Sequence, residues 1–236
     1  MSRTLVYGNG KSRLKWDLNQ ELQDNIITWG CNRIYNDTVV DNLVAVDYWI
    51  QHMVYESGYA KTNKCWFLDW QILPVDFDIT PMRLEYYNHQ ENEKNTGGKV
   101  VRGKDQPPLK GLYITWVDEN DMVEDIDFPK EWGSGTTAIH LACQQGAKEI
   151  YLIGFDLSAN PINNVYEEEQ KKFKINDDNR PFRFDWTNEL KTTIKEYPNT
   201  NFIWVDPSET TLDFFNYSSN NLTYDTYENI RRKICR

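Results

Sequence analysis

Four polar side chains that suit nucleotide recognition each stand directly after a strand predicted from the sequence. They are Asn9 after Tyr-Gly, Asn32 after Gly-Cys, Asp47 after Ala-Val and Asp156 after Gly-Phe. An asparagine offers a donor and an acceptor, which suits a base or a ribose, whereas a carboxylate offers acceptors only. Because the carboxyl ends of parallel strands lie at one edge of a sheet, we expect these four side chains to converge there.

Two turns of small residues offer backbone N–H groups to a phosphate. The first runs through Gly8, Asn9, Gly10, Lys11 and Ser12, and the second through Gly133, Ser134, Gly135 and Thr136. The second turn opens a predicted helix, whose N-terminus attracts anions and which Ser134 is expected to cap. The first turn matches neither the dinucleotide fingerprint, since Arg13 replaces its third glycine, nor the phosphate loop. Alone it also fits an ordinary tight turn, and Lys11 and Arg13 fit phosphate contacts or exposed charges.

The elements that would hold these turns follow from apolar runs. Strands are predicted at Thr4–Tyr7, Ile26–Gly30, Leu43–Val46, Lys64–Trp70 and Leu112–Val117, with a helix through Tyr55 that Gly58 closes. Ala138, Leu141 and Ala142 repeat at helical spacing until Gly146. Ile150–Phe155 does not alternate, which is typical of a strand covered on both faces. A helix at Trp186–Tyr197, a strand at Asn201–Val205 and a helix at Tyr227–Cys235 follow.

This order of elements predicts an α/β fold, Rossmann-like, with a mostly parallel sheet and helices on both faces. We interpret residues 1–236 as a single domain. Residues 74–111 are predicted to be an irregular insertion or a small hairpin subdomain. Residues 158–184 are long, charged and poor in aliphatic side chains, which is typical of a lid.

Composition limits the partners. The formal net charge is −10, which argues against a general binder of duplex DNA or anionic membranes. The four cysteines form no C-x-x-C pair, as in a reduced protein with structural thiols. No apolar run approaches membrane length, so we expect no membrane partner and a cytoplasmic location, in the host if the protein is viral. A homo-oligomer is left open.

The chain resembles the bacterial sialyltransferases of glycosyltransferase family 42, and equally the related phage and bacterial proteins with a pterin-pyrophosphokinase-like fold. The resemblance lies in Gly-Asn-Gly-x-Ser from residue 8, Cys-Asn at 31–32, Ser-Gly at 134–135 and the run 146–156. It covers residues 4–50 and 130–160 well. It implies a Rossmann-like domain that takes a nucleotide-activated sugar without a metal, and it implies nucleotide contacts from Asn9, Asn32, Ser134 and Gly135.

The resemblance also implies a mobile lid at 158–184, but the lid of this chain departs from the family. Ser158 stands at the first lid tyrosine and Tyr166 lies near the second, which would hold the leaving phosphate. No histidine follows residue 141, so the family's base is missing and CMP-sialic acid is not the expected donor. Asp185 and Asp156 are the candidates for a replacement base. Arg183, with Arg180, is a candidate to stabilise the leaving phosphate.

Together these residues predict a metal-independent glycosyltransferase with a nucleotide-sugar donor and no cofactor. Its acceptor is left open between a glycan, a protein and a modified nucleic-acid base. One rival is a pyrophosphokinase or nucleotidyl transferase, which would need a divalent ion. The patterns at 76–78 and 125–127 have the D-x-D form with which metal-dependent glycosyltransferases hold a divalent ion, but they fit surface acids better. The other rival is a non-catalytic nucleotide- or glycan-binding module.

Overall fold

The computed structural model describes residues 2–68, 70–73, 98–102, 114–117, 120–130, 132–157, 164–166 and 185–236. The strands in these ranges are β1 (Arg3–Tyr7), β2 (Ile26–Cys31), β3 (Asn42–Ala45), β4 (Cys65–Phe67), β5 (Trp70–Leu73), β6 (Gly98–Arg102), β7 (Ile114–Val117), β8 (Val123–Asp125), β9 (Glu149–Ile153), β10 (Asn201–Val205) and β11 (Leu222–Asp225). The α-helices are α1 (Tyr48–Glu56), α3 (Ser134–Gln144), α5 (Trp186–Glu196), α6 (Glu209–Phe215) and α7 (Tyr227–Ile234). Three 3-10 helices are η1 (Lys11–Lys15), η2 (Asn32–Asn36) and η3 (Tyr59–Lys61).

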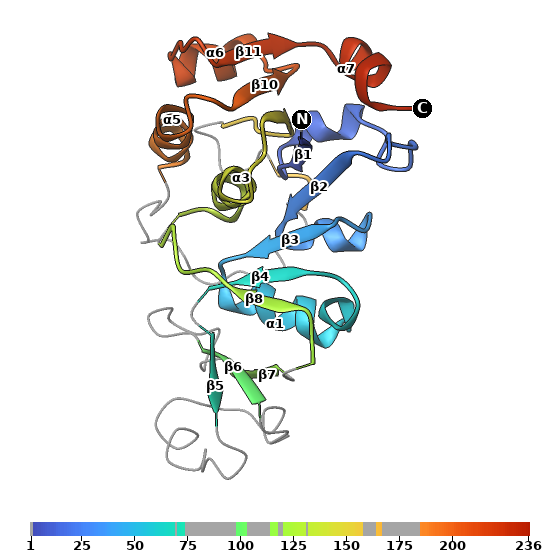
Figure 1. Cartoon of the computed structure of the whole chain (residues 1–236), viewed down its shortest axis with the longest axis vertical. Coiled ribbons are helices and arrows are strands. Elements are labelled where there is room, and N and C mark those ends of the chain that lie inside the picture. The colour runs from blue at the N-terminus through green and yellow to red at the C-terminus, as the bar shows by residue number, and fades with distance from the viewer. Residues whose placement is uncertain are drawn as a thin grey trace.

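Eight strands form one parallel sheet in the order β11-β10-β9-β1-β2-β3-β4-β8, which runs down the length of the molecule in Figure 1. From β1 the chain first builds the sheet outward through β2, β3, β4 and β8. It then returns through α3 to the other side of β1 and continues through β9, β10 and β11. The direction of growth therefore reverses between β1 and β9. The predicted α/β, Rossmann-like fold with a parallel sheet is confirmed.

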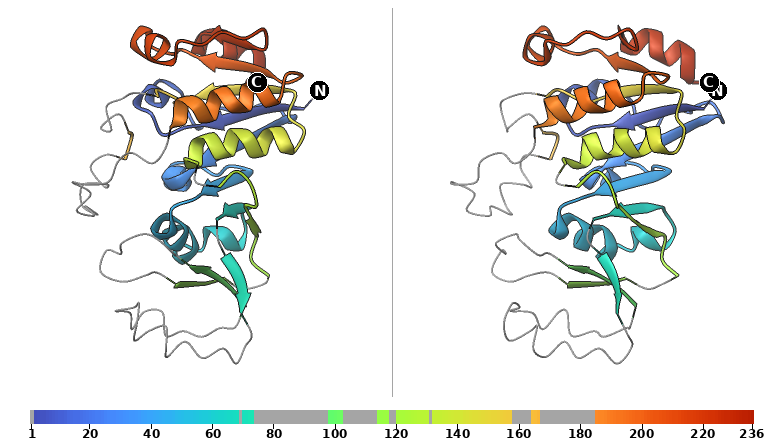
Figure 2. Two further views of the ribbon diagram at one scale, coloured as in Figure 1. Left: turned by 90° about the vertical axis from the view of Figure 1, so that its left-hand side faces the viewer. Right: turned by 60° about the vertical axis from the view of Figure 1, so that its left-hand side comes forward.

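Helices cover both faces of this sheet. Side chains along each strand therefore point alternately into two hydrophobic cores, one on each face. In β1, Leu5 and Tyr7 pack into the core that α1 and α7 cover, whereas Val6 packs into the core beneath α3 and α5. All three side chains are at most 3% exposed. Figure 2 shows α3 and α5 side by side over one face. Strands covered on both sides carry nearly continuous apolar runs, which is why the sequence reveals them.

The predicted strand at Lys64–Trp70 is wrong in extent. Its first part is β4 in the parallel sheet, and its last residue begins β5 in a separate antiparallel sheet of order β5-β6-β7. The strand predicted at Leu112–Val117 is β7 of that smaller sheet. β6 falls inside the predicted insertion at 74–111, and most of that insertion lies outside the described residues.

Besides the 3-10 helices, the sequence interpretation missed β8, β11 and α6. β8 has two exposed acids in three residues, β11 is an edge strand of four residues, and α6 is only seven residues long. None presents enough apolar periodicity to be recognised. Within the described ranges, no helix is both long enough and apolar enough to span a bilayer.

Candidate functional site

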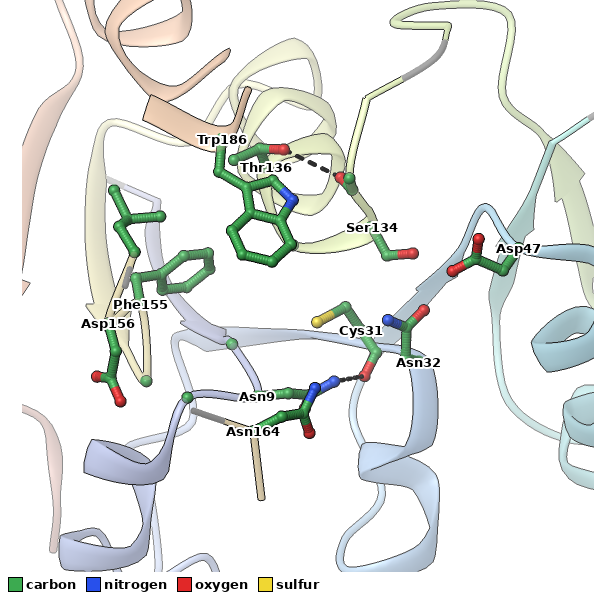
Figure 3. Close-up of a pocket in the computed structure, with 16 residues that line it drawn as sticks. Asn9, Cys31, Asn32, Asp47, Ser134, Thr136, Phe155, Asp156, Asn164 and Trp186 are labelled. Atoms are coloured by element: carbon green, nitrogen blue, oxygen red, sulfur yellow. Dashed lines mark hydrogen bonds between the residues drawn. The ribbon is translucent and has the colours of Figure 1, made fainter. Parts of the chain in front are cut away.

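A pocket opens at the carboxyl ends of β1, β2, β3 and β9, beside the point where the sheet reverses its direction of growth (Figure 3). Its empty volume is about 800 Å³, including space open to solvent. The described residues that line it come from the loops after these strands and from the starts of α3 and α5: Gly8, Asn9, Gly10, Cys31, Asn32, Asp47, Gly133, Ser134, Gly135, Thr136, Gly154, Phe155, Asp156, Leu157, Asn164 and Trp186.

The structure thus brings together most of the site residues predicted from the sequence. Gly8, Asn9 and Gly10 follow β1, Asn32 follows β2, Asp47 follows β3, Asp156 follows β9, and Ser134 and Gly135 open α3. Ser12 stands behind the wall, bonded to Asp156. Open parallel sheets bind ligands at this edge and at this reversal of strand order.

The amides of the first glycine turn do not form the expected phosphate cradle. The N–H of Gly8 donates to the Ile153 carbonyl oxygen at 2.7 Å, and the N–H of Gly10 donates to the Gly154 carbonyl oxygen at 2.8 Å. The N–H of Ser12 donates to Asp156 Oδ2 at 3.0 Å, and its hydroxyl donates to Asp156 Oδ1. A Cβ at Gly8 would lie 2.4 Å from the Gly154 oxygen. These glycines therefore serve close packing between the loops after β1 and β9.

At the start of α3, Gly133 rather than Ser134 is the N-cap residue, so the predicted cap is wrong. The Ser134 hydroxyl instead accepts the backbone N–H of Val46 at 3.1 Å, which ties α3 to the loop after β3. Glu189 of α5 caps the helix from outside: its Oε2 accepts the Gly133 N–H at 3.1 Å and the Thr136 hydroxyl. The amides of the first three helical residues have no acceptor within the helix and lie at the pocket.

The two glycines at this helix start make room for aromatic rings. A Cβ at Gly133 would lie 2.4 Å from Nε1 of Trp186, and a Cβ at Gly135 would lie 3.2 Å from the ring of Phe155. Both rings line the pocket, and Figure 3 shows Trp186 beside the start of α3. The pocket therefore has an apolar wall that suits the flat face of a base or sugar.

Two lining residues hold strained backbone conformations. Asn32 has φ 53° and Leu157 has φ 37°, both in the left-handed region. Within the described part of the chain, the buried Oδ1 of Asn32 has no hydrogen-bond partner. Strained residues and unsatisfied buried acceptors are costly, and they concentrate at functional sites.

Three predicted catalytic residues stand apart from the pocket lining or outside the described structure. Tyr166 is 8% exposed and bonds Arg13 and Asp37. Asp185 is exposed, caps α5 and accepts the backbone N–H of Asn188 at 3.2 Å. Arg183 and the predicted binding residue Ser158 lie outside the described residues. The roles assigned to these four residues stay predictions.

Arg13 is neither an exposed charge nor a pocket-lining phosphate contact. Its side chain is 2% exposed, and Asp37 accepts from its Nη2 at 2.7 Å. The guanidinium is held among other side chains of the fold.

The described lining residues include two carboxylates, from Asp47 and Asp156, and no lysine or arginine. Burial raises the pKa of the Cys31 thiol to about 12, so this lining cysteine is a neutral thiol. Burial also raises the pKa of Glu189 above its ordinary value, while its hydrogen bonds to Thr136 and Gly133 oppose that shift. Among the residues that the structure describes, no group of three or more His, Cys, Asp or Glu side chains could hold a metal ion.

Sequence reasoning missed the contributions of Trp186, Asn164 and Glu189, and it interpreted the four cysteines, Cys31 among them, as mostly structural thiols. Trp186 and Asn164 carry no motif of their own in the sequence. Phe155 stands inside the Gly-Phe-Asp end of β9, which was interpreted only for its acid. Two glycines at the start of a helix indicate that another group packs closely against the backbone there. They do not identify that group as an aromatic ring.

No protein-family model and no curated protein matches this chain. Two solved structures are similar to it. One is the sialyltransferase CST-II in complex with a trisaccharide acceptor and CMP, at 14% identity and a TM-score of 0.46 over 86% of this chain and 80% of the other. The second is CstII from Campylobacter jejuni with the substrate analogue cytidine-5'-monophosphate, at 14% identity and a TM-score of 0.41 over 93% and 86%. At these distances the similarity does not bear on what the present chain does.

Proposed function

We propose that the pocket holds the nucleotide half of a nucleotide-activated sugar and that the protein is a glycosyltransferase. The observation that carries this proposal is the position of the pocket. It lies at the reversal of strand order in a parallel sheet, where side chains from four loops and the start of a long helix meet. The acceptor is left open between a glycan, a protein and a modified base.

Each wall of the pocket suits one part of such a donor. Asn9 and Asn32 supply amide groups for a base or ribose, and the buried Oδ1 of Asn32 is available to accept. Trp186 and Phe155 supply the apolar surface. The first amides of α3 favour the phosphate, although the Glu189 carboxylate beneath them weakens that attraction.

Asp156 is the candidate base that is better placed, because it lines the pocket and Asp185 does not. In the proposed reaction the acceptor hydroxyl attacks the anomeric carbon, the bond from that carbon to the phosphate oxygen breaks, and Asp156 takes the acceptor proton. Ser12 orients the carboxylate through its N–H and hydroxyl. No step calls for a metal ion.

A second candidate function is a binding module without catalysis. It is favoured by the engagement of both predicted bases within the fold, Asp156 with Ser12 and Asp185 with Asn188. The two functions differ in whether bound donor is consumed.

The test is a thermal-shift screen against CMP-, UDP-, GDP- and dTDP-linked sugars, with magnesium and with chelator. A ligand at a hundred times its Kd adds about 2.7 kcal/mol of apparent stability. We expect at least one donor to stabilise the protein equally with chelator, and slow release of its nucleotide over long incubation. Asn32→Ala should abolish the shift, whereas Asn201→Ala, at the opposite end of the strands, should not.

Each other outcome has a meaning. Stabilisation that requires magnesium supports the pyrophosphokinase or nucleotidyl transferase rival. Stabilisation without any consumption of donor, even with mixed glycan acceptors, supports the binding module. If none of the four donors stabilises the protein, the proposed function is wrong.

A further inference from the structure

Arg13 is a buried cation, and one of its hydrogen-bond partners, Asn9, lines the pocket. Its Nη2 donates to Asp37 Oδ2 at 2.7 Å and to the Tyr166 hydroxyl at 2.9 Å, and its Nη1 donates to Asn9 Oδ1 at 3.3 Å. The guanidinium also lies over the Tyr166 ring, with Cζ 5.2 Å from the centroid. A buried charge persists only when it is paired and hydrogen-bonded, so these contacts are required by the fold.

Tyr166 closes this cluster from a distant part of the chain. Its hydroxyl donates to Asp37 Oδ2 at 2.6 Å while it accepts from Arg13. Burial raises its pKa, so the phenol stays protonated and keeps this donor. Two further bonds pin residues 164–166: the Val165 N–H donates to the Asn9 carbonyl oxygen at 2.8 Å, and the Tyr166 N–H donates to Asn164 Oδ1 at 2.9 Å. Asn164 itself lines the pocket.

The same cluster decides which way the Asn9 amide points. Arg13 can only donate, so the atom of Asn9 that faces it must be Oδ1. The Cys31 carbonyl can only accept, so the atom that faces it, at 3.2 Å, must be Nδ2. The amide therefore cannot flip. Each of these two bonds uses half of the capacity of its Asn9 atom, which leaves one N–H and one lone pair for a ligand.

We propose that Arg13, Asp37 and Tyr166 form a buried latch whose task is to position the ligand-binding face of the pocket. The latch fixes the Asn9 amide in one orientation and holds Asn164 in place as a wall. The proposal rests on the proposed function for the identity of the ligand, but not for the orientation of Asn9. All three are positioning residues, because none of them lines the pocket.

The test is Tyr166→Phe, which keeps the ring over Arg13 and removes the hydroxyl. Its matched control is Tyr59→Phe, since Tyr59 is also buried and its hydroxyl bonds the backbone of Val40 far from the pocket. Two readouts are made on the full chain. One is the side-chain amide NMR signal of Asn9, assigned through its loss in Asn9→Ala. The other is the Kd for CMP, UMP, GMP and dTMP by calorimetry.

We expect Tyr166→Phe to shift or broaden the Asn9 signal and to weaken the tightest of these nucleotides about fivefold to tenfold, the effect of one lost hydrogen bond. Tyr59→Phe should lower the melting temperature to a similar degree without either effect. The latch is refuted if the Asn9 signal stays unchanged in Tyr166→Phe, or if both variants bind alike. If the unaltered protein binds no nucleotide, the proposed function fails, and the Asn9 signal alone still decides whether the latch exists.

Discussion

Glu189 places a buried negative charge at the start of the helix that the pocket uses. The carboxylate is 6% exposed, and it accepts the N–H of Gly133 and the hydroxyl of Thr136. A helix start favours negative charge, but desolvation disfavours it, and burial is the larger effect on the pKa of this group. Glu189 therefore holds the start of α3 in place, but its burial lowers the folding stability by an amount that depends on pH.

Glu189→Gln should remove that dependence. The folded-state pKa is raised above the ordinary value of 4.5, so the unfolded chain loses its proton first as the pH rises above 4.5. Folding stability then falls, by at most about 1.4 kcal/mol per pH unit for one group, until the folded protein also ionises. Glutamine keeps an acceptor oxygen for both bonds. In urea unfolding from pH 4 to 7, the stability of Glu189→Gln relative to the unaltered protein should increase as the pH rises.

The control for this experiment is Glu228→Gln, on the exposed surface of α7. It should change the pH dependence little. If the unfolding free energies of the unaltered protein and of Glu189→Gln change in the same way between pH 4 and 7, the pKa of Glu189 is not raised in the folded protein.

Ser134 has two tasks that one substitution can separate. Its hydroxyl oxygen accepts the buried N–H of Val46 with one lone pair, so its proton stays for a ligand. Ser134→Ala should cost about 1–3 kcal/mol, because the Val46 N–H loses its partner, and it should also weaken nucleotide binding. Ser208→Ala removes the cap of α6, which costs about 1 kcal/mol, and should leave binding intact. Equal affinities for the two variants would show that Ser134 does not contact the ligand.

At the scale of elements, the start of α3 is fixed by how closely α5 approaches it. Trp186 opens α5 and occupies the space that a side chain at Gly133 would need. The helix start, the aromatic wall and the Glu189 contact therefore form one unit, held by packing between α3 and α5, which stand on either side of β9 in the chain. This is why the pocket depends on a glycine that contributes no chemistry of its own.

Gly133→Ala tests this dependence. The new methyl group must displace Trp186, and overpacking of this kind costs about 1–3 kcal/mol. Gly58→Ala is the control: Gly58 has φ 79° with no atom within 4 Å of an added Cβ, so the change costs about 1–2 kcal/mol of backbone strain alone. Both variants should melt earlier, but only Gly133→Ala should lose nucleotide affinity and shift the Trp186 fluorescence. If Gly133→Ala binds the nucleotide with unchanged affinity, the aromatic wall does not contribute to nucleotide binding.

The sequence predicted the strands and helices better than it predicted which contacts the residues at their ends make. β1, β2, β3 and β9 were recognisable because strands covered on both faces are continuously apolar. The convergence of Asn9, Asn32 and Asp47 followed from parallel strand ends. The packing role of the glycines could not be predicted from the sequence, because the lack of a Cβ shows only that the position needs space. Which atoms fill it, the Gly154 loop or Trp186, is decided by tertiary packing.

At the scale of the whole molecule, the strand order gives the pocket its place. The chain builds outward from β1, crosses back through α3 and continues on the other side of β1. The first and sixth strands of the sheet along the chain therefore become neighbours, and the pocket opens at the carboxyl-end edge beside the loops that follow them. The alternation of elements predicted a parallel sheet but not this order, which depends on the pairing of β1 (Arg3–Tyr7) with β9 (Glu149–Ile153), two strands far apart in the chain.

A crystal structure with the donor that stabilises the protein most would show whether the pocket holds the nucleoside. We expect density for the nucleoside in the pocket, with Asn32 and Ser134 in hydrogen-bond contact and a ring of the ligand against Trp186. Density for the nucleoside at the smaller β5-β6-β7 sheet, or at the amino ends of the parallel strands, would contradict it.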